Sequence, residues 1–116
     1  MAIVFITHDF GVVANMCHRV AVMYAGKIVE TASTREIFNA PVHPYTTALI
    51  NSVPRLDRKK DDRLYSIEGQ PPSMMDLPPG CRFRPRCTVA LPVCRDEEPS
   101  EIEIGAGHFV SCWRVK

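Results

Sequence analysis

The distribution of proline divides this sequence into two parts that can fold in different ways. Residues 1–40 contain no proline, whereas seven of the ten prolines lie between Pro71 and Pro99. Proline lacks a backbone N–H and fixes φ, so it interrupts both helices and central strands. From Pro54 onward we therefore expect no regular helix and no central strand, and few large apolar side chains are available there for a separate core.

The first part contains runs that are typical of strands. Apolar and β-branched residues predict strands at Ile3–Ile6, Val20–Tyr24 and Lys27–Thr31, with a turn at Gly26. In a larger sheet, Ile3–Ile6 and Val20–Tyr24 would be central strands, and in the chain alone they would leave sheet edges and apolar faces open. The alternation of strands with helices indicates the α/β fold class.

Residues that favour helix starts mark three helices in the same part. Asp9 is a good N-cap for the residues that follow it, and Ser33 with Glu36 has the spacing of a capping box for a helix that ends by Pro41. His43 precedes a proline at a first helical position, which predicts a third helix. Its apolar stripe would consist of Tyr45, Ala48, Leu49 and Val53.

Length and charge exclude several classes of protein. At 116 residues the chain forms one domain at most, and its 14 basic and 13 acidic residues favour neither nucleic acid nor an anionic membrane as a partner. No apolar run approaches the ~20 residues that cross a bilayer, and Met1–Ile6 lacks the basic start of a signal peptide. We expect a soluble, cytoplasmic chain whose five cysteines are free thiols or metal ligands.

Four cysteines lie in the proline-rich part with the spacing Cys81-x5-Cys87-x6-Cys94-x17-Cys112. Cys17 falls on the apolar side of the first predicted helix and is expected to be a small core residue. Four thiolates can bind tetrahedral zinc or an iron–sulfur cluster. Structural zinc sites usually contain tight Cys-x2–4-Cys pairs. The wider gaps in this sequence favour the larger cluster, with zinc as the alternative and four metal-free thiols as a third interpretation.

The residues around these cysteines also favour an anionic cluster. Arg82, Arg84 and Arg86 alternate between the first two cysteines. Guanidinium groups there would offset the negative charge of a cluster held by four thiolates and donate hydrogen bonds to sulfur. Phe83 and Trp113 could shield such a cluster from water.

Two sets of motifs resemble one protein family. The Thr7-His8-Asp9 triplet after an apolar run, with the pattern that continues to Glu30, resembles the switch-histidine region of ABC transporter ATPase subunits. The second set of motifs resembles the C-terminal extension of oligopeptide and dipeptide ABC transporter ATPase subunits. It consists of His43-Pro44-Tyr45-Thr46, Gly69-Gln70-Pro71-Pro72, and Gly80–Cys87 with Cys94 and Cys112 after it. The resemblance implies the end of a P-loop ABC ATPase domain followed by a loop-rich, cysteine-containing extension.

The resemblance also implies roles for individual residues. His8 would be the switch histidine, which contacts the γ-phosphate of ATP and helps to organise the attacking water. A 4Fe–4S cluster would be held by Cys81, Cys87, Cys94 and Cys112. The chain should then divide into residues 1–53, the end of the nucleotide-binding domain, residues 54–80, a charged and proline-rich connection, and residues 81–116, the Cys-rich metal-binding extension.

Other ATPase motifs are missing from the 116 residues. The sequence contains no G-x-x-x-x-G-K-[ST] loop (Walker A), no signature motif and no acidic Walker B strand. In the family these motifs precede the switch histidine, so the chain is expected to correspond to the C-terminal part of a subunit that binds ATP and Mg²⁺. Phosphoryl transfer needs a phosphate cradle, a metal ion and a base together. The 116 residues alone are therefore not expected to hydrolyse ATP.

The full-length subunit implied by the resemblance would be a peripheral protein on the cytoplasmic face of the inner membrane. It would act with a second ATPase subunit and with membrane permease subunits, which receive peptide from an extracytoplasmic binding protein. Two other classes stay open. One is a stand-alone zinc or iron–sulfur interaction module without an ATPase role. The other is a cysteine or histidine enzyme, although no cysteine has a recognisable nucleophile context.

Overall fold

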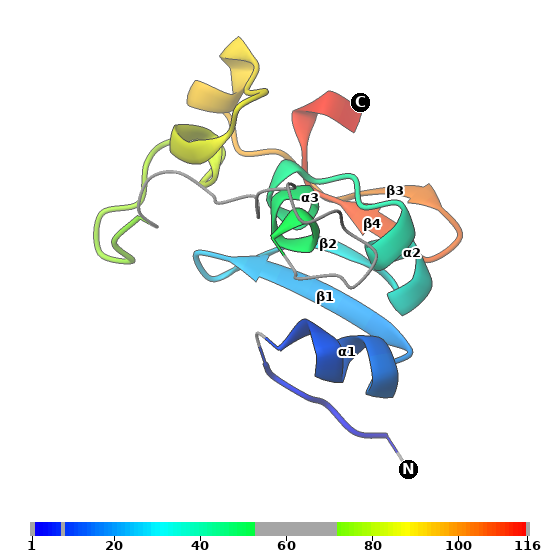
Figure 1. Ribbon diagram of the computed structural model, residues 1–116. Coiled ribbons are helices and arrows are strands. Elements are labelled where there is room, and N and C mark those ends of the chain that lie inside the picture. Colours follow the sequence, from blue (N-terminus) through cyan, green and yellow to red (C-terminus); the bar gives the residue numbers. More distant parts are fainter. Residues whose placement is uncertain (1, 8, 53–71, 116) are drawn as a thin grey trace, which may run out of the picture.

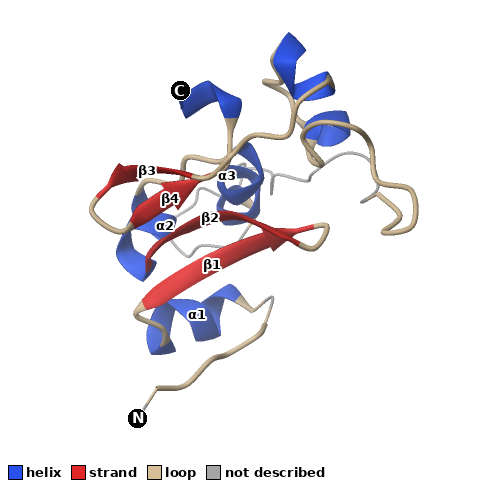
Figure 2. Cartoon of the chain, turned by 180° about the vertical axis from the view of Figure 1, so that it is seen from behind, coloured by secondary structure: helices blue, strands red, loops and turns tan. Residues whose placement is uncertain are grey.

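The computed structural model describes residues 2–7, 9–52 and 72–115 of the chain. At its centre is a four-stranded antiparallel sheet in the order β1-β2-β4-β3 (Figures 1 and 2). Its strands are β1 (Arg19–Tyr24), β2 (Lys27–Ser33), β3 (Ile102–Gly105) and β4 (His108–Val110). The helices are α1 (Phe10–Met16), α2 (Thr34–Asn39) and α3 (Pro44–Asn51). Helices α2 and α3 cover one face of the sheet, and α1 lies beside β1 at its edge.

Strands β1 and β2 form the hairpin that the sequence predicts at Val20–Tyr24 and Lys27–Thr31. Val22 of β1 and Val29 of β2 are buried, as expected for strands that face a core. The chain reverses at Ala25 and Gly26, which have φ values of 49° and 81°. Glycine adopts a positive φ without strain, so the turn predicted at Gly26 is confirmed.

The strand predicted at Ile3–Ile6 is not formed. These residues have no regular secondary structure, and their side chains are between 44% and 97% exposed. A strand is stable only when a neighbour satisfies its backbone N–H and C=O groups, and none of the four described strands pairs with this segment. The prediction was wrong because local sequence encodes strand propensity but not the presence of a partner strand.

The three predicted helix starts are confirmed. Asp9 accepts hydrogen bonds from two N–H groups in the first turn of α1, and Ser33 accepts one from the N–H of Glu36. Helix α3 begins directly after His43. The capping box at Ser33 is only half formed, because the Glu36 carboxylate lies 3.0 Å from Nδ1 of His108.

The helices differ in how deeply they pack. Helix α1 has no buried residue, and Cys17 after it is half-buried rather than a core residue. The predicted stripe of α3 is confirmed in part, since Ala48 is buried and Tyr45 and Leu49 pack against the core. Val53, the last member of that stripe, lies outside the described residues.

The β3–β4 hairpin corrects the prediction for the proline-rich part. Glu30 of β2 pairs with Val110 of β4, which places β4 between β2 and β3 as a central strand. The prediction failed because residues 100–116 contain no proline, so nothing prevents strand pairing there. Elsewhere from residue 72 to 115 the only regular elements are short 3₁₀ turns, at Arg84–Arg86, Pro92–Arg95 and Trp113–Val115.

Both parts of the chain contribute to one core. The ring of Tyr24 lies 4.7 Å from that of Tyr45 and 5.1 Å from that of Phe83, in edge-to-face contacts. Phe83 is 3% exposed and inserts from the proline-rich part between residues of β1 and α3. Because buried aromatic rings contribute strongly to packing, Phe83 anchors the cysteine-bearing segment to the first part.

The predicted division into residues 1–53, 54–80 and 81–116 stays a prediction, and much of the connection lies outside the described ranges. The sheet draws strands from both ends of the chain.

Among the helices in the described ranges, none combines the length and the hydropathy of a membrane span.

Candidate metal centre

The four predicted ligand cysteines line one hollow, which is also bordered by the apolar side chains of Phe83, Val89, Ala90 and Trp113. The four are Cys81, Cys87, Cys94 and Cys112, and each is a free thiol. One 3₁₀ turn contains Cys94, one ends just before Cys87 and one begins just after Cys112, and all three lie on the opposite side of the sheet from α1 (Figure 1). The fold thus brings together residues that are spread over more than a quarter of the sequence.

A close backbone approach joins Cys81 to Cys94. The N–H of Cys81 donates to the carbonyl oxygen of Cys94 over 2.9 Å. Gly80 makes this approach possible, because it has a φ of +73° and a Cβ atom added there would lie 2.3 Å from that same oxygen. No side chain larger than hydrogen fits such a position without displacing the backbone. In addition, the N–H of Leu91 contacts Sγ of Cys94 at 3.4 Å.

The sheet positions Cys112. Strand β4 ends at Val110, and the N–H of Ser111 then donates to the carbonyl oxygen of Val29 in β2 over 2.9 Å. This bond continues the pairing of β4 with β2 up to the residue before Cys112. The fourth cysteine is therefore fixed by the main sheet rather than by the turn-containing segment that bears the other three.

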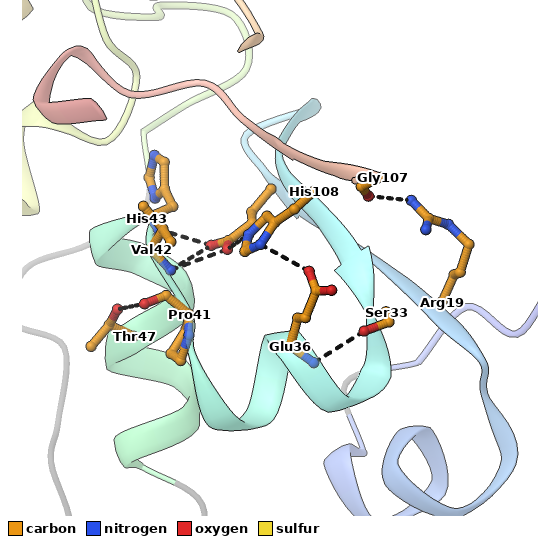
Figure 3. A network of polar contacts seen from close by, with 10 residues as sticks. Arg19, Ser33, Glu36, Pro41, Val42, His43, Thr47, Gly107 and His108 are labelled. Carbon is orange, nitrogen blue, oxygen red and sulfur yellow. Dashed lines mark hydrogen bonds and ion pairs between the residues drawn. The ribbon is translucent and has the colours of Figure 1, made fainter. Parts of the chain in front are cut away.

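A buried carboxylate holds β4 and the start of α3 together (Figure 3). Glu30 is 1% exposed and accepts hydrogen bonds from the N–H groups of Val42 (3.1 Å) and His43 (2.8 Å). Its Oε2 lies 2.6 Å from Nε2 of His108, and Nδ1 of His108 lies 3.0 Å from the Glu36 carboxylate. We call these five residues the Glu30 network. An imidazolium ring is the form of histidine that donates to both carboxylates at once.

Sequence reasoning missed the Glu30 network. The available signal was a glutamate inside a short predicted strand, where a buried charge requires partners. Those partners come from residues 12 to 78 positions away, so no local pattern identifies them.

His43 occupies the junction between α3 and the cysteine hollow. It is 1% exposed, and its Nδ1 accepts a hydrogen bond from the N–H of Tyr45 at 3.0 Å. Burial, together with the positive charge of Lys27, lowers the pKa of His43 to about 4. The capping bond agrees with this direction, because Nδ1 can accept only when it carries no proton.

The surroundings of the thiols affect their ionisation in opposite directions. Burial raises the pKa of Cys81, Cys87 and Cys112, and the nearness of other cysteine sulfurs adds to the rise. Backbone N–H groups act against it, by hydrogen bonding that favours the thiolate form. A bound cation or cationic cluster core would shift this balance toward thiolate, since metal ligation deprotonates a coordinating thiol.

The assignment of ligands stays a prediction. Within the described ranges, no three His, Cys, Asp or Glu side chains gather closely enough to hold a single metal ion. His8, the predicted γ-phosphate contact, lies outside the described residues.

Residues 29–94 match the family model described as "Oligopeptide/dipeptide transporter, C-terminal region". The chain belongs to this family. The match includes Cys81, Cys87 and Cys94, and it confirms the resemblance that the motifs indicate. The mixed helices and strands of the fold agree with a C-terminal region of an ABC ATPase.

Three relatives illustrate the similarity. A probable peptide ABC transporter ATP-binding protein of Sinorhizobium fredii is 52% identical over 97% of this chain and 34% of its own length. The oligopeptide transport ATP-binding protein of Escherichia coli is 45% identical over 97% of the chain and 33% of its own length. The dipeptide transport ATP-binding protein of Lactococcus lactis is 49% identical, with 97% and 32% covered. The chain thus spans about a third of the length of these relatives.

Proposed function

We propose that this chain is the C-terminal part of the ATP-binding subunit of an ABC-type importer of oligopeptides or dipeptides. The observation that carries the proposal is 52% identity, over 97% of the chain, with a probable peptide ABC transporter ATP-binding protein. In full-length form the subunit would couple ATP hydrolysis to peptide uptake. It would work on the cytoplasmic face of the inner membrane with a second ATPase subunit, membrane permease subunits and an extracytoplasmic peptide-binding protein.

Within that subunit, His8 is proposed to contact the γ-phosphate of ATP, which is bound with Mg²⁺. An imidazole N–H stabilises charge on a phosphoryl group during transfer. The phosphate-binding loop, magnesium ligand and general base do not occur among these 116 residues, so we propose that the chain alone does not turn over ATP. Turnover that is lost in His8→Ala would contradict this.

The second element of the proposal is a 4Fe–4S cluster held by Cys81, Cys87, Cys94 and Cys112. Three observations support the fit: all four thiols line one hollow, none forms a disulfide, and an arginine N–H buried at the same hollow has no hydrogen-bond partner among the described residues. Each thiolate of such a site binds a different iron atom, so the four sulfurs need not converge on one point as they must for zinc. Zinc is the alternative metal.

We propose that the cluster, when bound, is mainly a structural cross-link, with redox sensing as a secondary hypothesis. The segment that carries Cys81, Cys87 and Cys94 contains only short 3₁₀ turns. Small modules with little core usually depend on a metal or on disulfides for stability. The comparisons lend no support to a stand-alone metal-binding module without an ATPase role.

A chimeric transporter tests the proposal. This chain would replace the matching 113 residues of the E. coli relative, in a strain that lacks that subunit. Peptide uptake should be restored, and His8→Ala in the chimera should abolish ATP hydrolysis while ATP binding is retained. A chimera that assembles with the permease subunits but gives no uptake would contradict the proposed function.

A further inference from the structure

The side chains of the three arginines between Cys81 and Cys87 make different contacts. Arg82 donates to the carbonyl oxygen of Ala25 over 2.6 Å, and its Nε lies 3.5 Å from the Glu98 carboxylate. Arg86 donates to the hydroxyl of Tyr24 over 3.4 Å, and its guanidinium carbon lies 5.8 Å from the centre of the Tyr24 ring. Both side chains are therefore used to attach the cysteine-bearing segment to the β1–β2 hairpin.

Arg84 behaves differently from its two neighbours. It borders the hollow that the four cysteines line, and its Nε is buried without a hydrogen-bond partner among the described residues. A buried N–H that donates to nothing is costly, and more so when it belongs to a charged group. Native structures rarely tolerate one, so its position calls for an acceptor that is not among the described residues, such as a group bound in the hollow.

The lining of the hollow shows what kind of acceptor fits. Arg84 and Arg114 are both cations, and no aspartate or glutamate occurs among the described residues that border the hollow. Arg114 is exposed and already donates to the carbonyl oxygen of Val89 over 3.2 Å. The remaining walls include Pro44, Phe83 and Trp113, whose apolar surfaces strengthen electrostatic interactions. An anionic group with several hydrogen-bond acceptors suits this arrangement.

We propose that Arg84 is a positioning residue for the cluster and donates its Nε–H to one of the cluster's sulfur atoms. This inference rests on the cluster proposed above. A donor that is fixed before the cluster binds stabilises the cluster's negative charge, and the reduced state carries one negative charge more than the oxidised state. Arg84 therefore slows cluster loss and raises the reduction potential, since hydrogen bonds to sulfur tune both.

The test compares Arg84→Met with Arg114→Met, each in the full 116-residue chain prepared without oxygen. Both variants remove one cation from the same hollow, but of the two only Arg84 has a buried donor with no partner among the residues that the structure describes. In the metal-free chain, Arg84→Met should leave the urea midpoint unchanged or raise it, because an unsatisfied buried group is removed. In the cluster-loaded chain, it should speed the release of iron to an excess of chelator by about tenfold.

A potentiometric titration with dithionite as reductant, followed by electron paramagnetic resonance, gives a second readout. Arg84→Met should shift the one-electron equilibrium about tenfold toward the oxidised cluster, which is about 59 mV. Arg114→Met should shift it much less, because its guanidinium is exposed and screened by water. Failure of Arg84→Met to take up a cluster, under conditions that load Arg114→Met, would also support the proposal.

Two results would overturn the inference in different ways. If Arg84→Met destabilises the metal-free chain and has the same potential and iron release as Arg114→Met, then Arg84 is only a structural residue and the cluster itself stands. If the unsubstituted chain takes up neither iron nor sulfide, the proposed cluster is wrong, and the proposed role of Arg84 is then wrong as well.

Discussion

Glu30→Gln tests how β4, and with it Cys112, is held in place. The change removes the charge from a side chain that is 1% exposed and replaces one acceptor oxygen with an NH₂ donor. That carboxylate accepts from the N–H groups of Val42 and His43 and lies 2.6 Å from Nε2 of His108. Removing one partner of a buried charged pair costs about 3–5 kcal/mol. We expect a loss of that size in the free energy of unfolding, against the about 5–15 kcal/mol typical of a domain.

The assay is urea unfolding at pH 7, followed by the fluorescence of Trp113, the single tryptophan. With a slope of about 2 kcal/mol per molar urea, the midpoint should fall by about 2 M. Glu36→Gln is the matched control, because it removes the other carboxylate of the same histidine from a side chain that is 43% exposed. An exposed ion pair contributes about 0–1 kcal/mol, so this variant should change little. Equal losses in the two variants, or a loss below about 1 kcal/mol in Glu30→Gln, would refute the reasoning.

Three further predictions follow from the site. Gly80→Ala should lower the free energy of unfolding by about 2–4 kcal/mol, because the φ of +73° and the 2.3 Å approach of a new Cβ to the Cys94 carbonyl oxygen are both unfavourable. Gly105→Ala, whose Cβ would meet nothing closer than 3.9 Å, should change it by less than about 1 kcal/mol, and equal effects would contradict the close approach. Because burial lowers the pKa of His43 from 6.5 to about 4, the unfolded chain takes up this proton first, and stability should fall by about 3 kcal/mol as the pH drops from 6.5 to 4. His43→Asn keeps a capping acceptor and should lose this part of the pH dependence, so identical pH profiles in the two proteins would count against it. Chelation of the proposed metal should speed amide hydrogen exchange in residues 81–115 far more than in β1 and β2. Unchanged protection of residues 81–115 would rule out the metal as a structural cross-link.

The features that sequence predicted correctly are those fixed by local chemistry. The β1–β2 hairpin depends on a glycine turn between two apolar runs, and the helix starts depend on Asp9, Ser33 and His43 acting within one turn. These interactions join residues close in sequence, so the pattern carries them.

The features that sequence missed depend on distant partners. Val110 pairs with Glu30 across 80 positions of the sequence, whereas Ile3–Ile6 finds no partner among the described strands. Strand propensity is similar in the two cases, and only the tertiary context separates them. Likewise, the order of polar residues along the strand gave no sign that His108 would be placed against Glu30.

The candidate site shows the same division. The four cysteines could be grouped from their spacing, and the fold does place them around one hollow. The alternating arginines looked equivalent in the sequence. Their roles separate only through contacts with Ala25, Glu98 and Tyr24, which occupy Arg82 and Arg86, whereas Nε of Arg84 has no acceptor in the described part of the chain.

The central claim is that Cys81, Cys87, Cys94 and Cys112 together hold a 4Fe–4S cluster. The most direct test is to measure iron, acid-labile sulfide and zinc per chain, with the visible absorption spectrum, in protein purified without oxygen. The account predicts about four iron atoms and about four sulfides per chain with a charge-transfer spectrum, all lost when the four cysteines are replaced by serine. One zinc per chain without sulfide, or a colourless protein with four titratable thiols at these positions, would contradict it.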